Sequence, residues 1–363
     1  MHDPARRDGI ARPYHACVPR PLLIFTDERM MLHDPGADHP EQPARLRAAV
    51  AALRNTGLPL RWHAPAPAPV EAILALHDRA YVDRILGLRG RSAQLDPDTA
   101  LSPGSIDAAL LAAGAAIDAV KAVCTPGAET TAAVALVRPP GHHAERGCAM
   151  GFCLFDNIAI AADHAIRSLG LERVLIVDWD VHHGNATQHL FEERNDVLFV
   201  SLHQFPFWPG TGGPGEIGIG PGEHFTLNIP LPEGCGDAEY VHCFRALVEP
   251  VARQFMPQLV LISAGFDAHR RDPLAGMRVT EAGFSAMCAS MRGIADRCAD
   301  GKIALVLEGG YDLEALGASV AACARVLTAD VPAVPDIGTP HPAIDELVGR
   351  LRALHAPRWR FNE

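Results

Sequence analysis

Residues 173–185 read Arg-Val-Leu-Ile-Val-Asp-Trp-Asp-Val-His-His-Gly-Asn, and this stretch is the most informative one about the fold class. Its first half is a continuous apolar run, which is typical of a strand buried on both faces of a parallel sheet. Its second half carries Asp178, Asp180 and His182, one polar residue at every second position. Because open α/β sheets bind ligands beyond the carboxyl ends of their strands, the pattern predicts a functional site at this end.

The same stretch supplies candidate metal ligands. Asp180 and His182 offer an oxygen and an imidazole nitrogen two residues apart, which suits a divalent ion such as Zn²⁺. A third ligand would be Asp267, which follows a second apolar run that breaks at Gly265. Three protein ligands leave a coordination position open, as in catalytic zinc sites. Taken singly, each aspartate fits a helix cap or a turn equally well.

Two further apolar runs also end in chemically useful residues. Residues 134–137 are followed by two prolines, a glycine and then His142 and His143. A histidine pair in a rigid turn favours a functional role, since burying two imidazoles without partners is costly. Residues 303–307 are followed by a glutamate, two glycines and Tyr311, whose hydroxyl could face a developing oxyanion.

Apolar runs alternate with helical patterns such as residues 106–123 and 281–298. This alternation predicts an α/β protein, with a single-domain open parallel sheet covered by helices on both faces. We expect a loosely ordered extension over residues 1–20 and one domain over residues 21–363. The predicted strands cover residues 22–26, 132–137, 173–178, 197–202, 259–263 and 303–307.

Composition narrows the function classes. The formal net charge of the 363 residues is −11, and no cluster of five or more Lys or Arg occurs, which argues against direct binding of nucleic acid. The nine cysteines are scattered without a Cys-x-x-Cys pattern, which argues against a disulfide framework or a cysteine-ligated zinc site. Because we find no signal peptide and no apolar run of about 18 residues, we expect a cytoplasmic protein that does not associate with membranes.

Five motifs occur in order along the chain, preceded by His39-Pro-Glu41. Together they resemble the zinc-dependent histone deacetylase family, in its class II and bacterial histone deacetylase-like branch, from about residue 22 to about residue 325. The resemblance implies the arginase-deacetylase fold. The motifs are Arg138-Pro-Pro-Gly-His-His143, Gly151-Phe-Cys153, Asp178-Trp-Asp-Val-His-His-Gly-Asn185, Ser263-Ala-Gly-Phe-Asp267 and Glu308-Gly-Gly-Tyr311.

The resemblance implies a zinc-dependent deacetylase that hydrolyses an acetyl or short acyl amide of an acyl-lysine or a related acylated amine. It also implies one zinc ion per chain and a structural potassium ion. The implied roles are zinc ligation by Asp180, His182 and Asp267, general base chemistry by His143, electrostatic support by His142, oxyanion donation by Tyr311, orientation of His142 by Asp178, and contact of Asn185 with His143.

The implied potassium ion would lie beneath the active site. A second, outer potassium site is not expected, because the cationic Arg194 occupies a matching position. The inner site would use the Asp178 side chain, the backbone carbonyls of Asp180, His182 and Leu202, and the hydroxyl of Ser201.

Substrate access is expected through a narrow tunnel with aromatic walls, which suit an alkyl stem. Arg45 either guides acetate away from the site or lies on a helix surface. The expected tunnel residues are Phe152, Phe207 and Trp208 in the walls, with Leu274 and Asp98 at the rim.

Alternative functions remain open on these residues alone. An acetylpolyamine amidohydrolase ranks second, because the polyamine-specific branch has a glutamate at the tunnel mouth where this chain has Leu274. A binding or sensing protein without catalysis, and a two-metal ureohydrolase of the same fold, are less favoured. The natural substrate and the oligomeric state are not indicated, and a homo-oligomer stays among the options.

Overall fold

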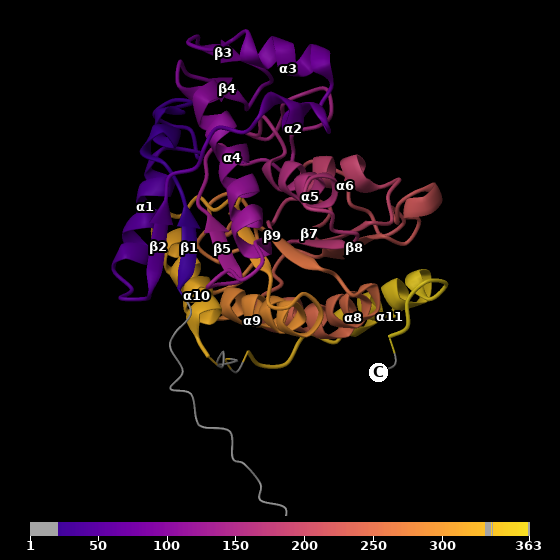
Figure 1. Ribbon diagram of the computed structural model, residues 1–363. Coiled ribbons are helices and arrows are strands. Elements are labelled where there is room, and N and C mark those ends of the chain that lie inside the picture. Colours follow the sequence, from indigo (N-terminus) through magenta and orange to yellow (C-terminus); the bar gives the residue numbers. More distant parts are fainter. Residues whose placement is uncertain (1–20, 331–334, 336, 362–363) are drawn as a thin grey trace, which may run out of the picture.

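The computed structural model describes residues 21–330, 335 and 337–361, so the expected extension over residues 1–20 lies outside the described residues. An eight-stranded parallel sheet crosses the molecule in the order β2-β1-β5-β10-β9-β6-β7-β8 (Figure 1). Its strands are β1 (Leu22–Phe25), β2 (Leu60–His63), β5 (Ala132–Ala135), β6 (Val174–Asp178), β7 (Val197–Gln204), β8 (Thr226–Leu231), β9 (Leu259–Ala264) and β10 (Ile303–Leu307), and a separate antiparallel pair is formed by β3 (Ala93–Gln94) and β4 (Ala100–Leu101).

The six predicted strands are confirmed as β1, β5, β6, β7, β9 and β10, each within two residues at either end. The two edge strands, β2 and β8, complete the sheet. The β8 segment contains Pro230, and a proline cannot donate to a central ladder but is tolerated at a sheet edge. Its place at the edge therefore explains how a segment interrupted by proline still forms a strand.

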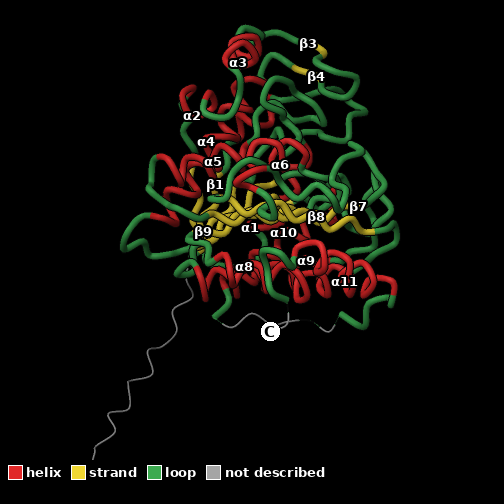
Figure 2. The backbone as a smooth tube through the Cα atoms, turned by 90° about the vertical axis from the view of Figure 1, so that its right-hand side faces the viewer, coloured by secondary structure: helices red, strands yellow, loops and turns green. Residues whose placement is uncertain are grey.

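Helices cover both faces of the sheet, as Figure 2 shows. The helices α2, α4, α5 and α6 lie on one side, and α8, α9, α10 and α11 lie on the other. The bounds are α1 (Ala44–Arg54), α2 (Val70–Leu74), α3 (Arg79–Leu86), α4 (Ser105–Cys124), α5 (Asn157–Arg167), α6 (Asn185–Phe191), α7 (Asp237–Cys243), α8 (Glu249–Phe255), α9 (Glu281–Cys298), α10 (Leu313–Thr328) and α11 (Ala343–His355), with short helical turns η1 (Glu28–Leu32), η2 (Gly220–Gly222) and η3 (Phe244–Val248).

Side-chain caps fix where three of these helices begin. Asp156 Oδ1 accepts a hydrogen bond from a backbone N–H in the first turn of α5, and Asp312 Oδ1 does the same for α10. Thr280 caps α9 through its hydroxyl. Each such cap stabilises a helix by about 1 kcal/mol. The caps therefore set the length of the loops that lead from the strand ends.

The strand order brings the chemically useful strand ends together. Strand β9 lies between β6 and β10, and β5 lies on the other side of β10. Because all four strands are parallel, their carboxyl ends meet at one edge of the sheet.

Among the described residues, no helix is long and apolar enough to cross a lipid bilayer.

Candidate metal centre and active site

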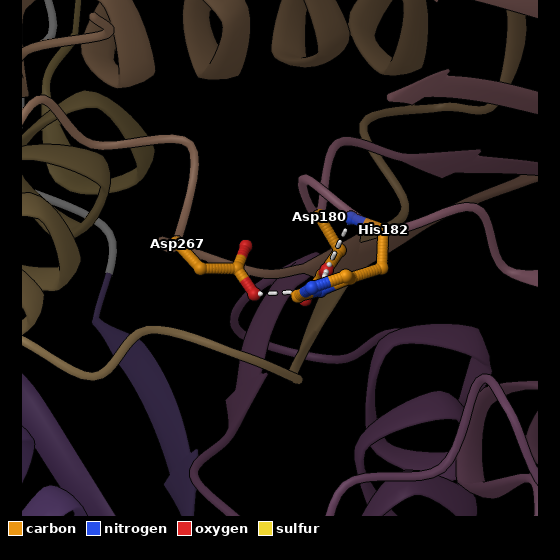
Figure 3. A group of neighbouring side chains, drawn as sticks. All are labelled: Asp180, His182 and Asp267. Carbon is orange, nitrogen blue, oxygen red and sulfur yellow. Dashed lines mark hydrogen bonds and ion pairs between the residues drawn. The ribbon is translucent and has the colours of Figure 1, made fainter. Parts of the chain in front are cut away.

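Three predicted ligands converge where β6 and β9 end. In Figure 3, Asp180 and His182 follow β6, Asp267 follows β9, and the three side chains point toward one another. Their candidate ligand atoms all lie within 4.8 Å of one another. His182 Nδ1 lies 3.1 Å from Asp180 Oδ1 and 3.3 Å from Asp267 Oδ2. Two carboxylate oxygens and one imidazole nitrogen form a donor set that suits zinc.

The electrostatics of this cluster favour a cation. Burial opposes protonation of His182, but its hydrogen bond to Asp180 and the nearby Asp267 raise its pKa to about 10. Asp267 Oδ1 accepts from the Val181 N–H at 2.9 Å, while its buried Oδ2 makes no hydrogen bond with a described residue and has only the 3.3 Å ion-pair contact with His182. A buried carboxylate oxygen without a donor is what a metal ligand requires, since metal coordination replaces the missing donor.

Two glycines allow the carboxylates to approach the backbone. A Cβ atom at Gly265 would lie 2.1 Å from Asp180 Oδ2, and a Cβ atom at Gly309 would lie 2.1 Å from Asp267 Oδ2. Any side chain at either position would displace a ligand. The Gly309 N–H also donates to Asp180 Oδ2 at 2.9 Å, so the glycine turn orients this ligand as well as admitting it.

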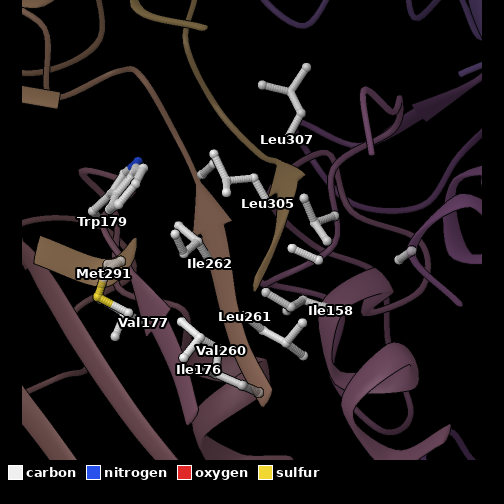
Figure 4. Packing of buried hydrophobic residues seen from close by; sticks show 14 of the residues in the cluster. Ile158, Ile176, Val177, Trp179, Val260, Leu261, Ile262, Met291, Leu305 and Leu307 are labelled. Carbon is white, nitrogen blue, oxygen red and sulfur yellow. The ribbon is translucent and has the colours of Figure 1, made fainter. Parts of the chain in front are cut away.

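The predicted ligands follow strands of a tightly packed sheet. Figure 4 shows residues of β6 and β9 packed on both faces, with Val177 on the side of Met291 in α9 and Leu261 on the side of Ile158 in α5. All four side chains are fully buried. Burial of each aliphatic side chain of this size contributes roughly 1.5–3 kcal/mol, so the strand ends that carry the ligands are held rigidly.

The adjacent histidines have different partners. His142 Nδ1 lies 2.8 Å from Asp178 Oδ2, and His143 Nδ1 lies 2.7 Å from Asn185 Oδ1. Although burial opposes it, the carboxylates of Asp178 and Asp180 raise the pKa of His142 well above its ordinary value. Burial, together with the neighbouring His142, holds the pKa of His143 well below its ordinary value. The pair therefore combines a protonated and a neutral imidazole at neutral pH.

A buried glutamate fixes the turn that presents these histidines. Glu308 Oε2 accepts from the backbone N–H groups of Gly141 at 2.6 Å and His142 at 3.2 Å. Burial raises the pKa of Glu308 to about 8. Glu308 thus links the segment that follows β10 to the histidine turn that follows β5.

Arg45 is fully buried, so the expectation of a helix-surface arginine is wrong. Its guanidinium donates to the carbonyls of Glu308 and Gly310 and pairs with Glu41 at 2.9 Å. The Glu41 carboxylate also accepts two hydrogen bonds from Arg138. Glu41 of the His39-Pro-Glu41 stretch therefore supports the Glu308-Gly-Gly-Tyr311 turn through its buried ion pair with Arg45.

Tyr311 ends that turn and lines a cavity together with His182, one of the predicted metal ligands. Burial raises the pKa of the Tyr311 hydroxyl well above its ordinary value, so it remains a hydrogen-bond donor. The Arg45 guanidinium lies over the face of the tyrosine ring, 4.9 Å from its centre, and this cation–π contact helps to position the ring. Tyr311 therefore has the protonation state that an oxyanion donor needs.

This cavity has a volume of about 230 Å³ and is bordered by Tyr311, His143 and His182. The structure brings all five expected tunnel residues to its walls. The His143 and Trp208 rings are 4.6 Å apart, and His182 stacks on Phe207 at 5.4 Å. The lining residues are Asp98, His143, Gly151, Phe152, His182, Phe207, Trp208, Leu274 and Tyr311.

Comparison with known proteins gives the same assignment as the geometry. Residues 39–327 match the model of the histone deacetylase domain. The chain belongs to the histone deacetylase family. The crystal structure of the HDA15 HD domain superposes on it with a TM-score of 0.86 at 37% identity, covering 94% of this chain and 95% of that one. The predicted arginase-deacetylase fold is thereby confirmed.

Curated histone deacetylase relatives come from distant organisms. A probable deacetylase from Archaeoglobus fulgidus is 40% identical over 297 residues, covering 80% of this chain and 81% of that protein. A histone deacetylase-like amidohydrolase from Pseudomonas aeruginosa is 42% identical over 281 residues, covering 76% and 73%. The human polyamine deacetylase HDAC10 is 39% identical over 370 residues, and the match covers 97% of this chain and 53% of the human protein.

The residues expected around potassium lie on neighbouring strands of this deacetylase fold. Asp178 of β6 is paired in register with Ser201 of β7, and Leu202 follows. The Ser201 hydroxyl lies 2.9 Å from His203 Nδ1. Arg194, which argued against an outer potassium site, forms ion pairs with two carboxylates.

The sequence did not reveal the two residues, Glu145 and His189, that are linked to Asn185 by hydrogen bonds. Asn185 Nδ2 donates to Glu145 Oε1 at 2.6 Å, and the same oxygen lies 2.8 Å from His189 Nδ1. The available signals were weak. Glu145 comes two residues after His143, and His189 comes one helical turn after Asn185 on α6.

A larger hollow of about 650 Å³ lies beside α1 and β2, with Trp62, Arg54 and His63 in its lining. It shares no residue with the histone deacetylase motifs or with the expected tunnel. Choosing a functional site by cavity size alone would therefore favour the hollow beside α1 and β2 over the smaller cavity where the titratable groups converge.

Proposed function

We propose that this histone deacetylase-family hydrolase is a zinc-dependent amidohydrolase that removes an acetyl or other short acyl group from an acyl-lysine or a related acylated amine. The observation that carries the proposal is the cluster of Asp180, His182 and Asp267, of which His182 lines a cavity together with His143 and Tyr311. Ligands, a neutral imidazole and a phenol donor thus converge on one small volume, which is what amide hydrolysis requires.

Three side chains of the protein have separate roles in proton transfer and charge stabilisation. His143 uses Nδ1 for Asn185, so its Nε2 is free to accept a proton from water and to return it to the leaving amine. His142, held by Asp178, supplies positive charge nearby. The Tyr311 hydroxyl donates to the oxygen on which negative charge develops.

A zinc ion held by Asp180, His182 and Asp267 would polarise the acyl carbonyl and lower the pKa of a water molecule towards about 7. We further propose one zinc ion per chain and a structural potassium ion held by Asp178, Ser201 and the backbone carbonyls near them. The aromatic walls would enclose the alkyl stem of the substrate and exclude bulky groups.

The activity is assigned to one domain over residues 21–363. The test combines metal analysis of the purified protein with kcat/KM for a panel of acylated lysines, polyamines and acyl-amine metabolites. We expect about one zinc per chain and hydrolysis of short acyl amides. A hundredfold preference for one substrate would correspond to about 2.7 kcal/mol of differential transition-state binding. A zinc-loaded protein that hydrolyses none of the panel would contradict the proposal.

An acetylpolyamine amidohydrolase is the second candidate. A polyamine deacetylase is among the relatives, and Asp98 gives the cavity a carboxylate at its rim. Against it, the rim position where the polyamine-specific branch has a glutamate is occupied by Leu274, which offers no charge to a cationic substrate. Higher kcat/KM for acetylspermidine than for an acetyl-lysine peptide would favour this second candidate.

A further inference from the structure

A chain of hydrogen bonds runs from His143 toward the surface. His143 Nδ1 contacts Asn185 Oδ1 at 2.7 Å, Asn185 Nδ2 contacts Glu145 Oε1 at 2.6 Å, and Glu145 contacts His189 at 2.8 Å. His143 and Asn185 are buried, whereas the side chains of Glu145 and His189 are 22% and 39% exposed. The chain therefore connects the proposed general base to a carboxylate outside the cavity.

An asparagine beside a histidine leaves the proton position undetermined. A side-chain amide has an acceptor at one end and a donor at the other, so Asn185 could turn either end toward His143. If its NH₂ group faced the ring, Nδ1 would have to accept, and the proton of the neutral imidazole would lie on Nε2. Such a ring could not take a proton from water inside the cavity.

Glu145 removes this ambiguity, because an ionised carboxylate only accepts hydrogen bonds. It holds the NH₂ end of Asn185, which leaves the amide oxygen facing His143 Nδ1. An oxygen acceptor requires Nδ1 to carry the proton, so Nε2 keeps its lone pair. His142 needs no such helper, since its partner Asp178 is itself a carboxylate.

The position of Glu145 is itself fixed. Its backbone carbonyl accepts from His77 Nδ1 at 2.9 Å, which anchors this loop to the α2–α3 region. Its Oε1 atom also meets His189, which lies on the same face of α6 as Asn185 one turn later. Burial opposes ionisation of Glu145, but the hydrogen bond from His189 lowers its pKa, so the carboxylate is ionised at neutral pH.

We infer that Glu145 is a positioning residue that acts through Asn185 to set the tautomer of His143, with the proton on Nδ1 and the lone pair on Nε2. The inference rests on the proposed hydrolase function for its kinetic consequence. The tautomer itself can be measured without any substrate.

The kinetic test is a double-mutant cycle on the zinc-loaded full chain. Glu145→Gln keeps the shape but offers either amide end to Asn185, so kcat should fall about 10- to 100-fold, the range of a hydrogen bond to a charged group. KM should change less than about threefold, because the substrate is not contacted. In an Asn185→Asp background the same Glu145→Gln change should cost less than about threefold, since an aspartate accepts from Nδ1 without help.

Two kinetic outcomes would overturn the inference. One is an equal loss in both backgrounds, which would mean that Glu145 only supports the loop. The other is no loss in the Asn185 background. Glu193→Gln is the matched control, because Glu193 is exposed just beyond α6 and makes no side-chain hydrogen bond or ion pair with any described residue.

The second measurement is independent of catalysis. Nitrogen-15 NMR of histidine-labelled protein, with the His143 signals assigned by their loss in His143→Gln, reports which ring nitrogen carries the proton. We expect protonated Nδ1 in the parent protein and a shift toward protonated Nε2 in Glu145→Gln. An unchanged tautomer would refute the inference. If the parent protein hydrolyses no acyl amide but the tautomer responds, the proposed function fails and the inference stands.

Discussion

The floor and the mouth of the cavity differ in their burial and in the chemistry of their side chains. The floor is formed by carboxylates and imidazoles at or next to strand ends, all buried or nearly so, whereas in the mouth the Trp208 side chain is 39% exposed. From this difference we expect that the two regions can be altered separately, with changes at the floor affecting the reaction rate and changes at the mouth affecting substrate preference. The floor comprises His143 and His182, which line the cavity, with Asp180, Asp267, His142 and Asp178 packed against them, and the mouth comprises Asp98, Phe152, Phe207, Trp208 and Leu274.

The largest effect is expected from removing a ligand at the floor. Asp180→Ala or His182→Ala should lose the zinc and lower kcat by at least about 10³-fold, because two remaining ligands hold the ion poorly. Metal analysis and steady-state kinetics check this. Asp300→Asn, at an exposed turn, is the control and should keep both metal and rate. A variant at Asp180 that retains one zinc and its full rate would show that the ligands are misassigned.

His143→Ala should keep the zinc while kcat falls about 10²- to 10⁴-fold, the range for a general acid-base group. Metal content and substrate KM should stay near those of the parent protein. His63→Ala removes an exposed imidazole far from the floor and serves as the control. Turnover close to that of the parent protein would transfer the role of base to His142.

Tyr311→Phe should lower kcat by about 10²- to 10³-fold and change KM far less, because the lost hydrogen bond acts mainly in the transition state. Packing should survive, since the ring and its contact with Arg45 remain. A hydroxamate inhibitor should still bind within about 1–2 kcal/mol, the scale of one hydrogen bond. Loss of zinc in this variant, or an unchanged rate, would make Tyr311 a structural residue.

Leu274→Glu tests the mouth, where we expect a change in preference instead of rate. A carboxylate at the rim should raise kcat/KM for acetylspermidine relative to an acetyl-lysine peptide by about fivefold, the effect of roughly 1 kcal/mol from a partly exposed ion pair. Leu274→Gln is the matched neutral control. An unchanged ratio would refute the argument that this position selects against polyamines.

The smallest effect is expected from Asn185→Asp, which alters the acid limb of the pH–rate profile. Activity requires neutral His143, so it is lost as the pH falls through the pKa of this residue. Since burial and His142 hold that pKa low, a carboxylate at position 185 should raise it and move the acid limb upward by about one pH unit. The exposed Asn195→Asp is the control. An acid limb that does not move would mean that another group controls it.

Much of the floor could be predicted from the sequence, because Asp178, Asp180, His182 and Asp267 lie at or within four residues of a strand end. The apolar run before Asp178 and the run before Asp267 are local signals, and parallel strands must bring such ends to one edge. The buried position of Arg45 could not be predicted, since its partners at Glu308 and Gly310 lie more than two hundred residues away in the chain. The link from Asn185 to Glu145 was likewise hidden, because it depends on how a loop packs against α6.

The glycines at positions 265 and 309 have a consequence for mutational scanning. Alanine scanning subtracts atoms at every ligand, but at these two positions it adds a methyl group at the place of a carboxylate oxygen. Gly265→Ala and Gly309→Ala would therefore belong with the ligand variants in a ranking of damage, although neither glycine has a side chain to contribute. We therefore expect tolerance to substitution to report on the space around the predicted metal ligands as well as on those residues themselves.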